Sequence, residues 1–183
     1  MMRPTDLISP SYLAEQVILH AAPRGYGGRG AKWAEMVRHL MTKYRVSSVL
    51  DYGCGQGTLV AELRRKARGV RFSEYDPAIP SKAQLPSFAD LVVCTDVLEH
   101  IEHDKLDAVL AHVRLLARKR VFFVISTKAT HKWLTDGRNA HLTIESRDWW
   151  KARLVQSGFR LTRIAPKIGQ QKPTHEWVCV VKP

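Results

Sequence analysis

The sequence predicts an α/β fold in which a doubly wound, mostly parallel sheet is covered by helices on both faces. Short continuous apolar runs, such as Val46 to Leu50 and Val121 to Ile125, are typical of strands buried on both sides. Amphipathic helical patterns alternate with these runs along the chain. The run to Leu50 also ends in Asp51, three glycines on alternate positions, and a helical stretch from Thr58 to Ala67, which together predict a strand, a tight turn and a helix.

Length and composition indicate one globular domain over residues 1–183, since 45% of the residues are hydrophobic. No apolar run approaches the roughly 20 residues that span a bilayer, and the N-terminus shows no signal-peptide pattern. We therefore expect no membrane association and a cytoplasmic location. Cys54, Cys94 and Cys179 have no paired metal-ligand spacing, so we expect reduced, mostly buried thiols.

The whole chain carries a formal net charge of +12, and the positive charge is concentrated in its second half. Residues 1–109 hold 14 Lys and Arg against 13 Asp and Glu, whereas residues 110–183 hold 15 against 4. Such asymmetry favours an anionic partner, either nucleic acid or a phosphorylated small molecule, although a solvated basic surface would explain it as well.

The chain before the first strand is predicted to hold two helices joined by a glycine-rich loop. Ser11 to His20 is predicted to be helical, with Ser11 as its N-cap. Pro23 to Gly30 is rich in glycine and predicted to be a loop. Ala31 to Tyr44 has apolar positions at steps of three and four, which indicates a helix packed on the sheet.

The turn Asp51-Tyr52-Gly53-Cys54-Gly55-Gln56-Gly57 resembles the first motif of the class I S-adenosylmethionine-dependent methyltransferases, Asp/Glu-x-Gly-x-Gly-x-Gly. Asp51 is well placed to receive a cationic amino group, whereas a pyrophosphate-binding turn usually leaves that position uncharged. The resemblance implies a Rossmann-like fold, S-adenosylmethionine as cofactor, and a loop from Gly53 to Gly57 close to its methionine part. It also implies that part of residues 1–30 folds over the cofactor as a lid, with Tyr26 and Arg29 as candidates.

The second strand, Val70 to Asp76, ends in acidic residues about 20 positions after the glycine loop. A nucleotide-binding fold places an acid there because one carboxylate can accept both ribose hydroxyls. Asp76, directly before Pro77, resembles the family position best, and Glu74 is the competing choice.

The segment from Pro77 to Ala89 departs from the family pattern. It has three prolines and no strand-like run, although a full-length fold has a helix and a third strand there. We therefore predict that the third strand is shortened or missing. The loop from Ala83 to Pro86 would then cover the adenine.

The fourth strand, Asp90 to Cys94, leads into Thr95, Asp96 and a Leu-Glu-His sequence ending at His100. This sequence resembles a signature of many small-molecule and RNA methyltransferases of the class. The resemblance assigns residues 46–101 to the cofactor-binding core and places Cys94, Thr95 and Asp96 at the pocket.

The last third of the chain is predicted to hold a helix around Leu106 to Leu116, the fifth strand Val121 to Ile125, a substrate loop and a terminal antiparallel hairpin. The loop, residues 127–145, follows a strand on the same rim as the glycine loop, where open α/β sheets bind ligands. Its Arg138, Asn139 and His141 are the candidate acceptor contacts. Ser146 should cap a helix that ends at Gly158, before strands at residues 159–164 and 177–181.

Methyl transfer depends mainly on alignment and desolvation, sometimes with a general base. His100 is the leading candidate for that base and His141 the second. We expect no resident metal. The alternative is a divalent-metal site formed by Asp96, Glu99, His100 and His141, a set that resembles the metal-dependent 2′-O-methyltransferases of small RNAs.

Other functions fit the sequence less well. The residues after the fourth strand lack the Asn/Asp-Pro-Pro-aromatic motif of DNA amino-methyltransferases, and no Pro-Cys dipeptide offers a C5-cytosine nucleophile. The spacing Gly-x-Gly-x-x-Gly of dehydrogenases is absent as well. A non-catalytic, basic nucleic-acid-binding module remains as an alternative. The sequence thus predicts a methyltransferase acting on an anionic acceptor, small molecule or RNA, of unidentified reacting atom.

Overall fold

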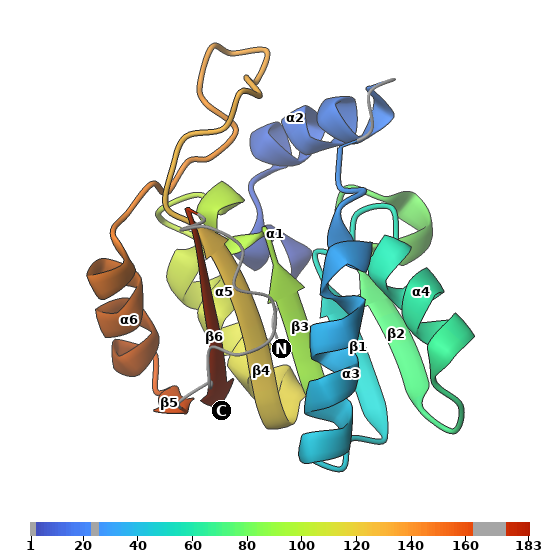
Figure 1. Ribbon diagram of the computed structural model, residues 1–183. Helices are drawn as coiled ribbons and strands as arrows, with labels where there is room; N and C mark the ends of the chain where they lie inside the picture. Colours follow the sequence, from blue (N-terminus) through green and yellow to red (C-terminus); the bar gives the residue numbers. More distant parts are fainter. Residues whose placement is uncertain (1–2, 23–25, 163–174) are drawn as a thin grey trace.

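The computed structural model describes residues 3–22, 26–162 and 175–183 as a mixed sheet with helices on both faces (Figure 1). The six strands lie in the order β2-β1-β3-β4-β6-β5. Neighbours from β2 to β4 are parallel, and β6 is antiparallel to both β4 and β5. The strands are β1 (Ser48–Tyr52), β2 (Arg71–Tyr75), β3 (Ala89–Thr95), β4 (Ala117–Ser126), β5 (Arg160–Thr162) and β6 (Glu176–Lys182). The predicted fold class is confirmed.

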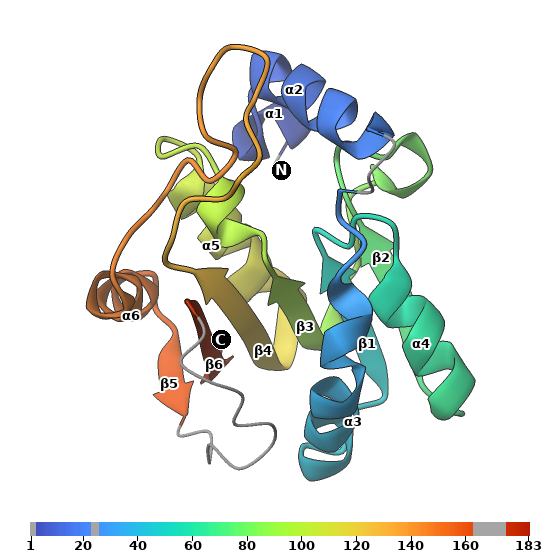
Figure 2. The ribbon, with the colours of Figure 1, turned by 45° about the horizontal axis from the view of Figure 1, so that its top comes forward.

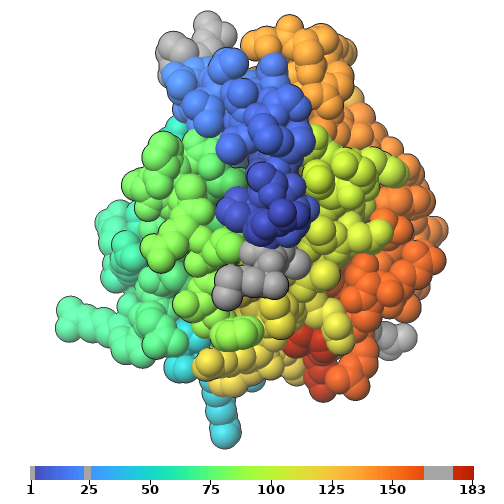
Figure 3. Space-filling model, turned by 180° about the vertical axis from the view of Figure 1, so that it is seen from behind, coloured from blue at the N-terminus to red at the C-terminus, as the bar shows by residue number. Residues whose placement is uncertain are grey.

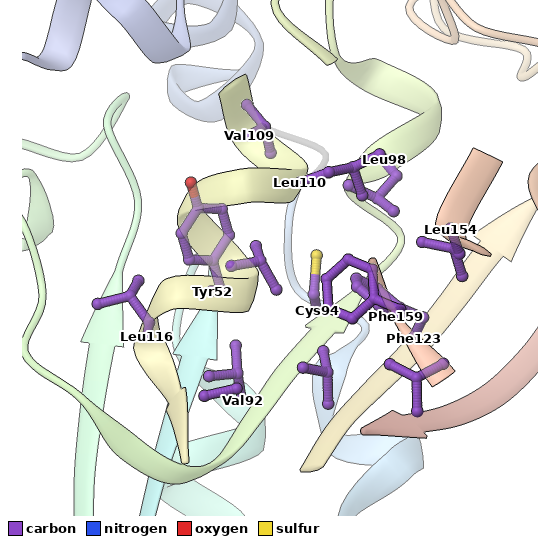
Figure 4. Close-up of a cluster of buried hydrophobic side chains, with 14 of the residues drawn as sticks. Tyr52, Val92, Cys94, Leu98, Val109, Leu110, Leu116, Phe123, Leu154 and Phe159 are labelled. Atoms are coloured by element: carbon purple, nitrogen blue, oxygen red, sulfur yellow. The ribbon is translucent and has the colours of Figure 1, made fainter. Parts of the chain in front are cut away.

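Helices pack on both faces of the sheet, because successive residues of a strand point to opposite faces and both sets are apolar. The helices are α1 (Pro4–Leu7), α2 (Pro10–Ala21), α3 (Ala34–Lys43), α4 (Thr58–Lys66), α5 (Leu106–Leu116) and α6 (Arg147–Gln156), and short 3-10 turns lie at Gly30–Trp33, Pro80–Lys82 and Leu98–His100. Phe122 of β4 packs with α3 and α4, whereas Phe123 packs with α1, α5 and α6. The cluster that contains Phe123 also holds the fully buried Trp150. Figure 4 shows part of this cluster, with Cys94 and Phe123.

The predicted loss of the third strand is confirmed. Between Asp76 and Ala89 the chain forms a single 3-10 turn, Pro80–Lys82, and no strand. Three prolines in this segment remove backbone donors that a strand would need. As a result β2 is the edge of the sheet, next to β1.

Two helix starts differ from the prediction: the segment predicted as a helix from Ala31 begins as the 3-10 turn Gly30–Trp33, with α3 starting at Ala34, and α2 has a different N-cap. Its N-cap is Ser9, whose Oγ accepts a hydrogen bond from the Tyr12 amide at 3.2 Å, so the prediction of Ser11 was wrong. Pro10 explains the difference, because proline is favoured at the first helical position, where its missing N–H costs nothing. The Ser146 cap and the left-handed Gly158 (φ +85°) are confirmed.

The expectation for the cysteines also agrees with the structure. Cys54, Cys94 and Cys179 are buried free thiols. Among the described residues, no helix combines the length and apolarity needed to cross a bilayer. Most of the link between the two C-terminal strands, residues 163–174, lies outside the described residues.

Candidate active site

The glycine loop after β1 is packed tightly against the chain that precedes the sheet. Gly55 has φ +51°, and a Cβ there would lie 2.5 Å from the carbonyl oxygen of Gly27. The Gln56 amide donates to that same oxygen at 3.1 Å, and the Gln56 side-chain amide donates to the Tyr26 carbonyl at 3.1 Å. Only glycine satisfies both the backbone conformation and the close approach. The segment around Tyr26 therefore packs on the glycine loop, and its predicted role as a lid over the cofactor stays a prediction.

Asp51, at the end of β1, is a buried carboxyl group that faces a large cleft. Its exposed fraction is 3%, and burial together with the nearby Glu74 raises its pKa to about 7. Gly53 and Cys54 of the loop line the same cleft. An acid held in this way would gain from a cationic partner.

Asp76 supports the glycine loop from the end of β2. One carboxylate oxygen accepts from the Gly55 amide at 2.9 Å, and the other accepts from the Ala78 amide at 3.0 Å. Asp76 also faces a small cavity, whereas the competing Glu74 is paired with Lys82 at 3.0 Å and lines neither cavity. These positions favour Asp76 over Glu74 as the ribose ligand.

Two cavities meet at the glycine loop. The large cleft has a volume of about 900 Å³ and lies between the segment from Tyr26 to Lys32 and the start of the substrate loop. The small cavity, of about 90 Å³, lies beside Asp76. Four residues line both: Tyr26, Gly53, Asp96 and His100. The boundary between the cavities is thus built from the lid segment and the two cofactor motifs.

The N-terminal helices line the small cavity; they belong to residues 1–30, the segment in which a lid was predicted, but these helices were not singled out. Leu7, Tyr12 and His20 line it together with Tyr75 and Pro77. Figure 3 shows the N-terminal residues in blue on the surface between the green part of the chain and α5. The loop from Ala83 to Pro86, expected to cover the adenine, lines neither cavity.

Of the three site residues predicted at the end of β3, two line the cleft and one lies in the core. Thr95 and Asp96 line the cleft. Asp96 has a left-handed backbone (φ +55°), and its carboxylate lies 3.4 Å from Nζ of Lys32. Cys94 is fully buried and packs with Leu98 and Phe123 in the core (Figure 4), away from both cavities.

His100 is held as a neutral, half-buried imidazole. Its Nδ1 lies 2.6 Å from the Ala140 carbonyl oxygen, and the Tyr26 hydroxyl lies 2.9 Å from Nδ1 and 3.1 Å from Nε2. Because a carbonyl can only accept, Nδ1 carries the proton and Nε2 accepts from Tyr26. Burial and the adjacent His141 lower the pKa of His100 to about 3. This arrangement suits a positioning residue better than the general base that the sequence suggested.

His141 and Glu99 complete the floor of the cleft. His141 Nδ1 lies 2.5 Å from the Lys128 carbonyl oxygen, which leaves Nε2 for a ligand, and burial lowers the pKa of His141. Glu99 is fully buried; one oxygen accepts from the Ser126 amide at 2.9 Å, and the other has no partner among the described residues. Burial and Asp96 raise the pKa of Glu99 to about 8.

The structure brings three of the four alternative metal ligands together. One atom each from Glu99, His100 and His141 lies within 4.8 Å of the others. Asp96 is not in this group and is paired with Lys32 instead.

Arg138 and Asn139 hold the substrate loop itself rather than facing the cleft. The Arg138 guanidinium pairs with Asp136 at 2.6 Å. The Asn139 side chain donates to the Thr130 carbonyl at 2.8 Å and accepts from its amide. Neither residue lines a cavity, so their positions give no support to the predicted acceptor contacts.

The cleft wall contains cationic residues that the sequence analysis did not select. Lys32, Lys128, His131 and Lys132 all line it. The only sequence signal for them was their place in two polar segments next to the glycine loop and after β4.

A doubly wound sheet with a buried acid before an alternating-glycine turn, a second acid at the end of β2 and a cleft at the carboxyl ends of the strands defines a class I S-adenosylmethionine-dependent methyltransferase. A family model described as a methyltransferase domain matches residues 22–164, and the chain belongs to that family.

Known proteins agree with this assignment. The chain is 32% identical over 123 residues to the chloroplastic magnesium protoporphyrin IX methyltransferase of Arabidopsis thaliana, a match that covers 54% of this chain and 39% of that protein. Human N-acetylserotonin methyltransferase, solved with S-adenosylmethionine, matches 99% of this chain and 60% of its own, with a TM-score of 0.62 and 13% identity. The Burkholderia thailandensis 1,6-didemethyltoxoflavin N1-methyltransferase, solved with S-adenosylhomocysteine, matches 97% of this chain and 85% of its own, with a TM-score of 0.61 and 17% identity.

Proposed function

We propose that the chain transfers a methyl group from S-adenosylmethionine to an anionic acceptor bound in the large cleft. The observation that carries this proposal is the pair of buried acids, Asp51 and Asp76, on either side of a glycine loop where two cavities meet. The cofactor, when bound, supplies an electrophilic methyl group.

The residues around the loop fit the parts of that cofactor. Asp51 would receive the ammonium group of the methionine part, because a buried carboxylate is stabilised by a cation. Asp76 would accept the ribose hydroxyls. The small cavity beside Asp76, lined by Tyr75, Pro77 and Val97, offers apolar surface for the adenine. Tyr26 would then lie over the cofactor at the boundary of the cavities.

The cleft supplies charge complementarity for the acceptor. Lys128 and Lys132 line its outer wall, and neither has a carboxylate partner within 4.0 Å in the described part of the chain. The acids Asp51, Asp96 and Glu99 line it as well, and Asp51 and Glu99 are buried. An anionic acceptor would therefore bind with its charge toward the outer wall and its reacting group toward the acids and the cofactor.

His141 is the best-placed proton acceptor for such an acceptor group. Its lowered pKa keeps the ring neutral at pH 7, and the Lys128 carbonyl fixes Nδ1 as the donor, so that Nε2 can accept. Proximity and exclusion of water supply the rest of the rate enhancement.

Calorimetric titration of S-adenosylmethionine and S-adenosylhomocysteine tests this proposal. We expect micromolar binding by the wild-type protein and a large loss in Asp76→Ala, with Asp104→Ala, a change at an exposed acid that lines neither cavity, as the control. Absence of binding by a folded wild-type protein would overturn the proposal and leave the non-catalytic nucleic-acid-binding alternative.

A second candidate, metal-assisted transfer to a hydroxyl group, is favoured by the group formed by Glu99, His100 and His141. The Glu99 oxygen without a partner among the described residues and the Nε2 of His141 are ligand atoms that suit a divalent transition metal. Such a metal would supply Lewis-acid polarisation of the acceptor oxygen. The Tyr26 hydroxyl on His100 and the pairing of Asp96 with Lys32 count against it.

Manganese binding, followed by electron paramagnetic resonance, separates the two candidates. Binding at micromolar concentrations by the wild type that Glu99→Gln and His141→Ala both remove would support the metal site. Equal spectra of free manganese with and without protein would reject it.

A further inference from the structure

The outer part of the substrate loop is a well-ordered hairpin. We call residues 130–141 the acceptor hairpin. Its two arms are joined by the Ala140 amide donating to the Lys132 carbonyl at 3.0 Å, by the Leu134 amide donating to the Arg138 carbonyl at 2.9 Å, and by a β-bridge between Trp133 and Asn139. The backbone of the hairpin therefore fixes where each side chain points.

Helix α2 holds the hairpin in place. Leu134 and Ala140 are buried against Ile8 and Tyr12. The Thr135 amide donates to the Glu15 carboxylate at 2.8 Å, and the Thr135 hydroxyl bonds to the same carboxylate. Figure 2 shows the hairpin beside α2 at the top of the molecule. The hairpin is thus a rigid extension of the cleft wall.

Trp133 is exposed on this rigid support. Its exposed fraction is 63%, the highest of any large hydrophobic residue that the structure describes, while the next residue, Leu134, is 4% exposed. Trp133 does not line the cleft, although its neighbour Lys132 does. The hairpin backbone holds the indole ring of Trp133 in solvent, so the ring presents a flat, exposed apolar surface near the cleft.

Unpaired positive charge lines the cleft close to Trp133 in the sequence. Lys128 and Lys132 line the cleft wall, and Lys132 directly precedes Trp133. The one acid of the hairpin, Asp136, is neutralised by Arg138 at 2.6 Å. Lys128 and Lys132 have no ion-pair partner among the described residues. A ligand that extends from the cleft onto the hairpin would have both lysines available for contact.

We propose that the acceptor is a single-stranded nucleic acid, whose phosphates contact Lys128 and Lys132 and one of whose bases stacks on Trp133. This inference rests on the proposed function and adds its substrate class. Aromatic platforms next to cations are how proteins hold single strands. A small anion would fill the cleft without reaching Trp133. An anionic membrane would meet the cations on a protruding surface, whereas here they line a concave wall.

Fluorescence anisotropy with a labelled 12-nucleotide RNA, and with DNA of the same sequence, tests the inference. We expect wild-type binding that weakens steeply with salt. Trp133→Ala should weaken it by about 5-fold or more, since stacking of one base contributes roughly 1–3 kcal/mol, and Trp133→Phe should restore most of it. Phe88→Ala, which removes an aromatic residue that is 49% exposed and precedes β3, is the matched control and should leave binding unchanged.

The outcomes separate this inference from the proposed function. S-adenosylmethionine binding without oligonucleotide binding, or oligonucleotide binding that Trp133→Ala and Phe88→Ala reduce equally, would overturn the inference alone. Competition by uridine monophosphate as strong as by the 12-mer, or binding to phosphatidylserine vesicles in place of the oligonucleotide, would overturn it as well. Failure to bind S-adenosylmethionine would count against the proposed function, whichever result the oligonucleotide gives.

Discussion

The Tyr26 hydroxyl and Nε2 of His100 lie 3.1 Å apart, and both residues line the two cavities that meet at the glycine loop. This hydrogen bond joins the segment over the loop to the Leu-Glu-His turn after β3. It also occupies the one ring nitrogen of His100 that is free to accept a proton. The contact therefore links the predicted lid residue to the predicted base and changes the role of the base.

Tyr26→Phe should leave His100 neutral while removing this bond. The pKa of His100, about 3, is lowered mainly by burial and by His141, and both of these remain in the variant. We expect no charging of the ring above pH 5, and a loss of about 1 kcal/mol in the free energy of unfolding for one hydrogen bond. Nitrogen NMR shifts of the imidazole report its protonation. If the His100 ring of the wild type titrated with a midpoint near pH 6.5, the ring would be open to water, and this account would be contradicted.

Cofactor affinity should fall as pH drops below 7. The raised pKa of Asp51, about 7, means that its carboxyl group becomes protonated below that pH, whereas the ammonium group of the cofactor stays charged. Asp51→Asn should lower affinity by roughly 10-fold or more at pH 8. It should also remove the pH dependence between pH 6 and 8. Calorimetric titrations at three pH values measure both effects. The same pH slope in Asp51→Asn would assign the titration to another group.

Gly55→Ala should destabilise the protein far more than Gly137→Ala. Both residues have positive φ, of +51° and +85°, but only the Gly55 Cβ would meet another atom, the Gly27 oxygen at 2.5 Å. We expect a loss of about 2–5 kcal/mol at Gly55 and about 1 kcal/mol at Gly137. Urea unfolding measures the difference. Equal losses would mean that the segment from Tyr26 to Gly28 does not pack on the loop as described.

Trp150→Ala should cost about 3–5 kcal/mol of unfolding free energy, because it removes a fully buried indole from the core between the sheet and α6. Leu115→Ala, at a residue that is 61% exposed, should change stability by less than about 0.5 kcal/mol. Denaturant unfolding of both variants gives the comparison. A loss at Trp150 as small as that at Leu115 would place α6 outside the cooperative core.

The centre of the sheet could be predicted from the sequence because β1, β3 and the second half of β4 are buried on both faces and are therefore largely apolar runs. Loss of the third strand followed from prolines that cannot join a ladder. The glycine loop and Asp76 followed from spacing along the chain. These features are local, so one sequence is enough to find them.

Contacts between distant segments could not be predicted in the same way. The wall that α1 and α2 give to the small cavity depends on tertiary packing, which leaves no local pattern. Polar loop residues are ambiguous for a related reason. Asn139 binds the backbone of its own loop, and a ligand contact would use the same side chain. The exposure of Trp133 could likewise not be predicted, because the sequence does not indicate which of the neighbours Trp133 and Leu134 is buried.

The most direct test of the central claim is the change in backbone amide NMR shifts when S-adenosylhomocysteine is added to the protein. We predict the largest changes at Gly53 to Gly57, at Asp76 to Ala78 and at Asp96 to Val97, which surround the meeting point of the two cavities. Changes confined to other parts of the chain, or no changes at millimolar ligand, would contradict the claim that this loop and its two acids bind the cofactor.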